Sequence, residues 1–213
     1  QFLAGGIDHP ECVAWSPNSW LACGGEAGQI YRVDLESKSV TEIANTGGFV
    51  LGITFDGEDN IYACDMARQA VLRIDTASGK IEDVTAGRTE VPLVNPNFSV
   101  FHPDGRLFFS ASGAWGARNG LIYCLYPDGR CQVVGRDSSA FTNGLAIDPD
   151  ASALYVVESE QPRIGRYSIL EDGLGEYEPL FELPRTVPDG LAFTADGTLL
   201  IGCYRPDRVL SWD

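Results

Sequence analysis

The chain has 213 residues, a hydrophobic content of 44% and a formal net charge of −15, from 30 acidic and 15 basic residues. This length suffices for one domain with a sizeable core. The sequence contains no run of 18 apolar residues, so no membrane span is predicted. The acidic balance disfavours nucleic acid and anionic membrane surfaces as partners, and it attracts cations.

A six-residue motif, called the frame from here on, occurs five times along the chain. In chain order its copies are 10–15 (PECVAW), 50–55 (VLGITF), 96–101 (PNFSVF), 142–147 (TNGLAI) and 188–193 (PDGLAF). The second position of the frame falls at 11, 51, 97, 143 and 189, so the steps are 40, 46, 46 and 46 residues. A period of this length is typical of a propeller or a solenoid.

Each repeat is predicted to contain four short strands separated by turn residues, with the frame as the first strand. The second strands are almost continuously apolar, which predicts burial on both faces, and lie at 20–23, 61–64, 107–109, 154–157 and 199–201. The third strands alternate, at 29–34, 70–75, 121–124, 163–167 and 208–213. The fourth are shorter and more polar, at 40–43, 80–84, 131–134 and 177–181. Polarity that rises from first strand to fourth predicts a blade whose first strand lies at the axis.

We therefore expect an all-β protein, a single β-propeller domain over residues 1–213 with five four-stranded blades. The fifth repeat stops after its third strand, because the sequence ends at Asp213. The opening residues 1–6 resemble the missing strand. We expect residues 2–5 to pair with 208–213 and to close the last blade, which would remove an open edge.

The six cysteines show no CxxC pair that would indicate a zinc site. Cys23, Cys64 and Cys203 occupy the apolar second strands of three repeats, and we expect them to be small buried hydrophobes. Cys124 and Cys131 flank the turn 126–129 and could be cross-strand neighbours, so a disulfide between them stays open.

Four of the five frames carry an oxygen-bearing side chain at their second position. These residues are Glu11, Asn97, Asn143 and Asp189, and Leu51 is the exception. A radial fold would aim equivalent positions at one axis. The alternative is local, because Asn143-Gly144 and Asp189-Gly190 are also common turn dipeptides.

The repeats resemble those of the gluconolactonase/regucalcin (senescence marker protein) family of six-bladed propellers. The resemblance covers nearly the whole chain and rests on the stretches PECVAW, PNFSVFHPDGRLFFS, TNGLAIDPDASALYVVES and PDGLAFTADGTLLIGCYRPDRVL. It implies a metal-dependent hydrolase that opens a small-molecule lactone. It also implies one divalent cation on the axis, held by Glu11, Asn97, Asn143 and Asp189.

Oxygen donors of this kind suit Ca²⁺ first, and then Mg²⁺ or Mn²⁺. Fe²⁺ or Zn²⁺ is also possible, although zinc normally prefers His or Cys ligands nearby. The cation would polarise the lactone carbonyl. Asp189 is the candidate catalytic residue, as general base towards the attacking water.

The chain departs from the family at several positions. Five blades are counted where the family has six. If residues 1–6 supply the missing strand, all five blades have four strands, which favours a compact five-blade protein over a truncated six-blade one. Asn95 stands where some members carry a substrate-binding Arg, and Phe98 where lactonases often carry Asp. Trp115 lies in a loop without an acidic residue for sugar hydroxyls. Asn95, Phe98 and Trp115 are the candidate substrate-binding residues.

Two other functions stay open at this point. The same metal could serve hydrolysis of other esters or phosphotriesters, or it could only stiffen a non-enzymatic binding propeller. Because no signal peptide is visible at the first residues, a cytoplasmic location is favoured.

Overall fold

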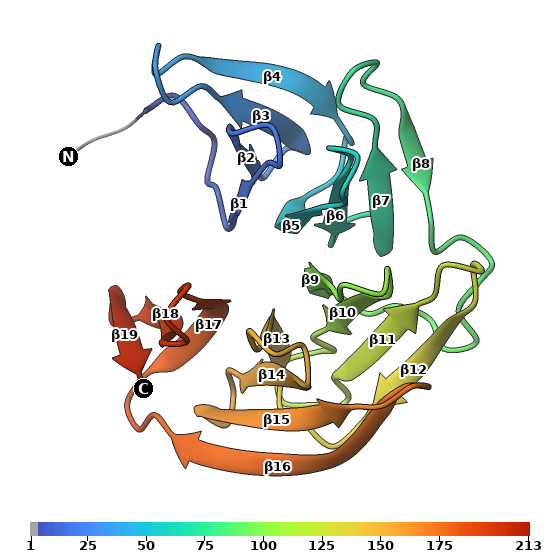
Figure 1. Cartoon of the computed structure of the whole chain (residues 1–213), viewed down its shortest axis with the longest axis vertical. Helices are drawn as coiled ribbons and strands as arrows, with labels where there is room; N and C mark the ends of the chain where they lie inside the picture. The colour runs from blue at the N-terminus through green and yellow to red at the C-terminus, as the bar shows by residue number, and fades with distance from the viewer. Residues whose placement is uncertain (1–3) are drawn as a thin grey trace.

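The computed structural model describes residues 4–213, which form β-strands arranged around a central axis (Figure 1). Four sheets have four antiparallel strands and one has three, and within each sheet neighbouring strands follow one another in sequence. The predicted five-bladed β-propeller is therefore confirmed. Within residues 4–213, no helix is long and apolar enough to cross a membrane.

The innermost strand of each blade carries the repeated frame. The inner strands are β1 (Val13–Trp15), β5 (Val50–Phe55), β9 (Pro96–Phe101), β13 (Thr142–Ile147) and β17 (Val187–Phe193). The second strands are β2 (Leu21–Gly24), β6 (Ile61–Asp65), β10 (Leu107–Ala111), β14 (Ala153–Glu158) and β18 (Leu199–Arg205). The third are β3 (Gln29–Val33), β7 (Ala70–Ile74), β11 (Leu121–Leu125), β15 (Arg163–Ile169) and β19 (Arg208–Trp212). The outer strands are β4 (Val40–Asn45), β8 (Ile81–Asp83), β12 (Cys131–Gly135) and β16 (Leu174–Glu182).

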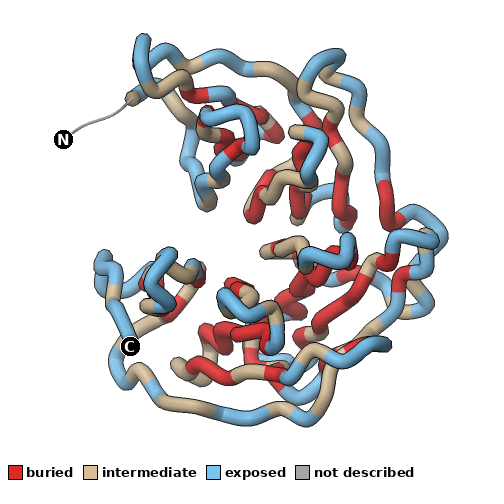
Figure 2. The backbone as a smooth tube through the Cα atoms, viewed as in Figure 1, coloured by how far each residue is buried: buried red, intermediate tan, exposed pale blue. Residues whose placement is uncertain are grey.

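Turn chemistry and hydrophobicity account for these strands. Gly105 and Gly197 have φ angles of 90° and 91°, which glycine adopts without the steric cost of a Cβ, and they connect inner to second strands. Every residue of β10 and of β14 is buried, as expected for a strand with a blade on each side. The outer strands β4, β8 and β16 are half-buried or exposed, whereas buried residues are concentrated in the second and third strands (Figure 2).

Adjacent blades are held together by apolar clusters, each of which lies between two neighbouring sheets. Separate clusters join the first blade to the second, the second to the third, the third to the fourth and the fourth to the fifth. An edge-on aromatic pair occurs in three of these interfaces, and in the first of them Trp20 packs against Phe55 with ring centroids 5.0 Å apart. Tyr62 packs edge-on against Phe101 with ring centroids 4.9 Å apart, and Tyr155 packs against Phe193 at 5.0 Å. Such pairs add to the area that each blade buries against the next.

The expected closing strand is not seen in the described part of the chain. The last sheet has the order β17-β18-β19, and residues 4–6 are assigned to no strand. Ala4 and Ile7 instead pack against Cys23, Tyr31 and Val33 of the first blade, where they cover apolar surface. Phe2 and Leu3 lie outside the described residues. Figure 1 shows the first and last blades at the two ends of the arc of blades.

All six cysteines are free thiols, and Cys23, Cys64 and Cys203 are buried as expected. No disulfide joins Cys124 to Cys131, because the strand register places them one position out of step. Cys124 lies opposite Gln132, and Cys131 lies opposite Leu125. Successive strand residues point to opposite faces, so the two thiols enter different clusters. Burial raises the pKa of Cys124 to about 12 and that of Cys131 to about 11.

Candidate metal and substrate site

A cavity of about 280 Å³ lies where the inner strands begin, at one end of the central channel. It is lined by Glu11, Phe49, Leu51, Met66, Asn95, Asn97, Trp115, Phe141, Asn143, Ser159, Val187, Asp189 and Tyr204. All four oxygen-bearing side chains of the frame therefore meet in one cavity. A second cavity is lined by the far ends of the same strands, including Phe55, Val100, Ile147 and Phe193.

Breaks in strand register accompany the frame's second position in four blades. In β9, Pro96 and Ser99 each pair with β10, but Asn97 and Phe98 between them do not. The same break falls at residues 51–52, 143–144 and 189–190. A break of this kind releases a residue from the ladder and redirects its side chain. The fold thereby turns Asn97, Asn143 and Asp189 towards the channel.

Glycines after the second position bring neighbouring inner strands close together. A Cβ on Gly144 would lie 2.3 Å from the carbonyl oxygen of Asp189, and one on Gly52 would lie 2.5 Å from that of Asn97. Both distances are shorter than any side chain tolerates. Only glycine at these two positions therefore allows one inner strand to approach the next so closely.

Each asparagine is oriented by a serine at the end of the second strand of its own blade. Asn97 Nδ2 donates to Ser112 Oγ at 3.0 Å, and Ser112 Oγ donates to the carbonyl oxygen of Thr142 at 2.7 Å. Because a hydroxyl has a single proton, a serine that donates to a carbonyl can only accept from the asparagine. The amide nitrogen must face the serine, and the amide oxygen of Asn97 is left for the cavity.

Asn143 repeats the arrangement one blade further on. Its Nδ2 donates to Ser159 Oγ at 3.1 Å, and Ser159 Oγ donates to the carbonyl oxygen of Pro188 at 2.6 Å. Both serines are buried, with Ser112 at 0% and Ser159 at 2% exposure. Each serine also ties its blade to the residue that precedes the next blade's candidate ligand.

Asp189 and Glu11 supply the two carboxylates of the site. Burial of Asp189 raises the pKa of its carboxyl group, the negative charge of Glu11 raises it further, and a hydrogen bond from Asn143 opposes both effects. Glu11 lies just before β1 rather than within it. His9 Nε2 is 3.6 Å from Glu11 Oε1, and His9 Nδ1 is 3.0 Å from Glu26 Oε2.

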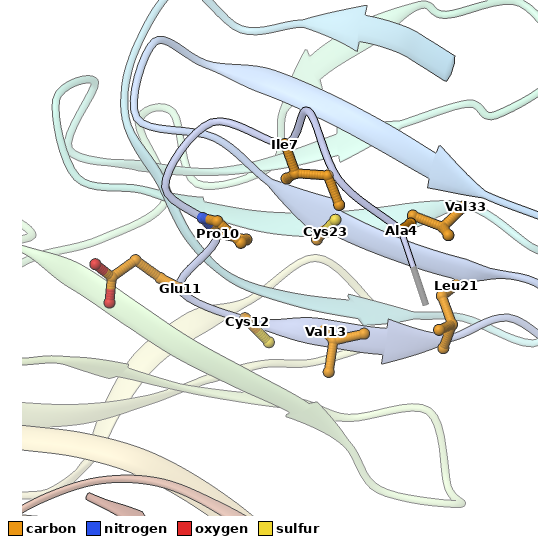
Figure 3. Close-up of a pocket in the computed structure, with 9 residues that line it drawn as sticks. All are labelled: Ala4, Ile7, Pro10, Glu11, Cys12, Val13, Leu21, Cys23 and Val33. Atoms are coloured by element: carbon orange, nitrogen blue, oxygen red, sulfur yellow. The ribbon is translucent and has the colours of Figure 1, made fainter. Parts of the chain in front are cut away.

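A different pocket borders the site on the first blade (Figure 3). It is lined mainly by apolar residues, among them Ala4, Ile7, Val13 and Val33. In the close-up, the carboxylate of Glu11 points away from these side chains. Glu11 is therefore directed out of this pocket.

The donor set of the main cavity fits a hard divalent cation. It offers two carboxylates and two amide oxygens, which are the ligand atoms that calcium prefers. Within residues 4–213, no group of three or more His, Cys, Asp or Glu side chains is placed to hold a metal ion. The two asparagines are therefore indispensable to a site here.

Of the three candidate substrate-binding residues, Asn95 and Trp115 line the cavity and Phe98 does not. The side chain of Phe98 packs instead against the cluster between the third and fourth blades, which contains Phe108 and Leu145, and it borders the second cavity. Two further sets of lining residues were missed. They occupy equivalent places in the repeats, so the alignment that found the second position could have found them. One set lies two residues before the second position and comprises Phe49, Phe141 and Val187; the other ends the second strand and comprises Met66, Ser159 and Tyr204.

Fold and site together define a β-propeller with four oxygen-bearing side chains in a cavity at its centre. Residues 9–213 match the family described as SMP-30/Gluconolactonase/LRE-like region. The chain belongs to this family, as its repeats indicate. It is 24% identical over 204 residues to the lactonase drp35 of Staphylococcus saprophyticus, with 89% of this chain covered. It spans only 61% of the length of that relative.

Solved structures share the fold. A gluconolactonase from Xanthomonas campestris superposes with a TM-score of 0.81 at 21% identity, covering 96% of this chain and 75% of that one. A calcium-binding regucalcin from Agrobacterium tumefaciens gives a TM-score of 0.80 at 19% identity, covering 97% of this chain and 71% of that one. Identities this low establish the common fold alone.

Proposed function

We propose that the chain is a metal-dependent hydrolase that opens a lactone, with one divalent cation held by Glu11, Asn97, Asn143 and Asp189. One observation carries the proposal. Four oxygen-bearing side chains from four blades line one cavity, and serines orient both asparagines. The names of the relatives, lactonase and gluconolactonase, support the same chemistry.

Calcium is the cation that suits the donor set best. No histidine or cysteine lines the described cavity, and such ligands are what zinc normally takes. The calcium-binding regucalcin with the same fold is in keeping with this choice. When bound, the cation would supply Lewis-acid polarisation of the lactone carbonyl, an effect of several kcal/mol.

Asp189 is the proposed general base. It takes a proton from water while the water oxygen bonds to the carbonyl carbon of the lactone. The proton then passes to the ring oxygen as the ring C–O bond breaks, and the product is a hydroxy acid. Burial and the charge of Glu11 raise the pKa of Asp189 when no metal is bound, whereas a cation bound to the same carboxylate would lower it. A base of this kind contributes roughly 10²–10⁴-fold to the rate.

A lactone panel tests the proposal. Acid release is measured for unsubstituted, alkyl-substituted and sugar lactones, with EDTA and then with added Ca²⁺, Mg²⁺, Mn²⁺, Fe²⁺ or Zn²⁺. We expect opening of at least one lactone, loss of that activity in EDTA and its return with a divalent cation. Turnover that persists unchanged in EDTA would contradict the metal dependence. No turnover of any lactone, with or without metal, would contradict the hydrolase and favour a binding propeller.

A further inference from the structure

The walls of the cavity around the candidate metal ligands are mainly apolar. The side chains that form them are Phe49, Leu51, Met66, Trp115, Phe141, Val187 and Tyr204. They come from the second, third, fourth and fifth blades. Apolar surface therefore surrounds the candidate ligands over most of the arc of blades.

Trp115 and Tyr204 expose much of their surface beside the cavity. Trp115 is 60% exposed and Tyr204 is 57% exposed, although both are large aromatic residues. The ring of Trp115 lies 5.1 Å from that of Phe141, with the planes tilted by 59°. Exposed aromatic surface at the mouth of a cavity is available to a ligand, and burying it against an apolar group is favourable.

The polar groups of the cavity are largely committed to other partners. Asn95 Nδ2 donates to the carbonyl oxygen of Gly113 at 2.9 Å, and Asn95 Oδ1 accepts from Gln69 Nε2 at 3.4 Å. Ser159 is engaged by Asn143 and Pro188. No lysine or arginine is among the described residues that line the cavity.

A sugar lactone would fit such walls poorly. Each of its hydroxyl groups exchanges hydrogen bonds with water for hydrogen bonds with the protein, and a hydroxyl that finds no partner is costly to bury. Beyond the candidate ligands, the hydroxyl of Tyr204 and the indole N–H of Trp115 are the main polar groups left to meet them. An alkyl or aryl substituent instead gains by covering Trp115, Phe141 and Tyr204.

We propose that the site takes lactones with an apolar alkyl or aryl substituent in preference to polyhydroxylated sugar lactones. This inference rests on the proposed function for the identity of the reacting group. The assignment of the substituent rests separately on the cavity walls. The aromatic side chains Trp115 and Tyr204 are its specificity-determining residues.

A matched pair of six-membered lactones tests this preference. δ-Decalactone carries a pentyl chain, and glucono-1,5-lactone carries hydroxyl groups on the same ring. We expect kcat/KM for δ-decalactone to exceed that for glucono-1,5-lactone by at least tenfold. Trp115→Ala and Tyr204→Ala should each narrow that ratio by several-fold. Trp15→Ala is the control, because Trp15 is 55% exposed but lines the cavity at the other ends of the strands.

Binding is measured as well as turnover, so that failure of the apolar-lactone preference can be distinguished from failure of the proposed hydrolase activity. Calorimetric binding of δ-decalactone that weakens in Trp115→Ala, without any turnover, would support the apolar specificity and contradict the hydrolase. A preference for glucono-1,5-lactone would overturn the inference while leaving the hydrolase intact. An equal ratio in wild type, Trp115→Ala and Tyr204→Ala would also overturn it. If δ-decalactone neither binds nor reacts, the inference is wrong.

Discussion

The hydroxyl of Ser159 accepts a hydrogen bond of 3.1 Å from Asn143 Nδ2 and donates one of 2.6 Å to the carbonyl oxygen of Pro188. Pro188 immediately precedes Asp189. One buried serine therefore fixes the amide orientation of one candidate ligand and is bonded to the strand that carries the next. Ser112 makes the same connection between Asn97 and Thr142, which precedes Asn143.

Removing the hydroxyl of Ser159 should weaken cation binding. In Ser159→Ala the amide of Asn143 loses the partner that orients it, at a cost of about 1 kcal/mol, or roughly a fivefold loss of affinity. Calorimetric titration with Ca²⁺, or Tb³⁺ luminescence, measures the loss. If the serine acts through Asn143, Ser159→Ala should have little further effect in an Asn143→Ala background. Additive losses in the double variant would contradict the orienting role.

Asp189 and Asn143 should differ in how far added metal rescues their variants. Asp189→Asn keeps an oxygen donor but removes a charge and the proposed base, so turnover should stay abolished at saturating cation. Asn143→Ala removes a neutral ligand and should recover much of its kcat as cation is raised. Steady-state rates over a range of Ca²⁺ concentrations compare the two. Equal rescue would show that Asp189 is only a ligand.

Gly144→Ala should destabilise the fold, because its Cβ would lie 2.3 Å from the carbonyl oxygen of Asp189. We expect a loss of about 1–3 kcal/mol in the free energy of unfolding by urea, the usual cost of overpacking, together with weaker cation binding. Gly190→Ala is the matched control, since a Cβ there meets no atom within 4 Å. Similar losses in both variants would show that the close approach of the strands is not the cause.

The turn after β9 should make stability depend on pH. Burial raises the pKa of Asp104, but hydrogen bonds from Arg106 and His102 outweigh this effect and hold the pKa well below its ordinary value. Arg106 Nε lies 2.8 Å from Asp104 Oδ2, and Arg106 Nη1 donates to the carbonyl oxygen of Leu170 in the fourth blade. A depressed folded-state pKa contributes stability that is present above the unfolded pKa near 3.9 and is lost as the pH falls below it.

Asp104→Asn tests this contribution by urea unfolding at pH 7, pH 4 and pH 3. We expect wild type to be more stable than the variant at pH 7, by roughly 1 kcal/mol or less because Asp104 is 44% exposed. The difference should shrink towards pH 3. Asp128→Asn is a comparison at a similar but more exposed turn, where Asp128 pairs with Arg130. A difference in the Asp104 variant that does not change with pH would contradict the linkage.

The sequence alone determined the blade pattern and the positions of the candidate ligands. Strand period and turn residues are local properties of the chain, so they predicted strands, turns and a rising polarity from axis to rim. Equivalent positions of a repeat point the same way in a radial fold. For this reason the shared position of Glu11, Asn97, Asn143 and Asp189 in the repeat predicted that they meet in one cavity.

Only the tertiary structure decided how strands align and which way individual side chains turn. The register of β11 against β12 separated Cys124 from Cys131, and the break in β9 sent Asn97 to the channel and Phe98 to the core. The hydrogen bond from Ser159 to Pro188 and the aromatic wall at Trp115 depend on contacts between blades. Such contacts join residues far apart in the chain, and no local pattern specifies their geometry.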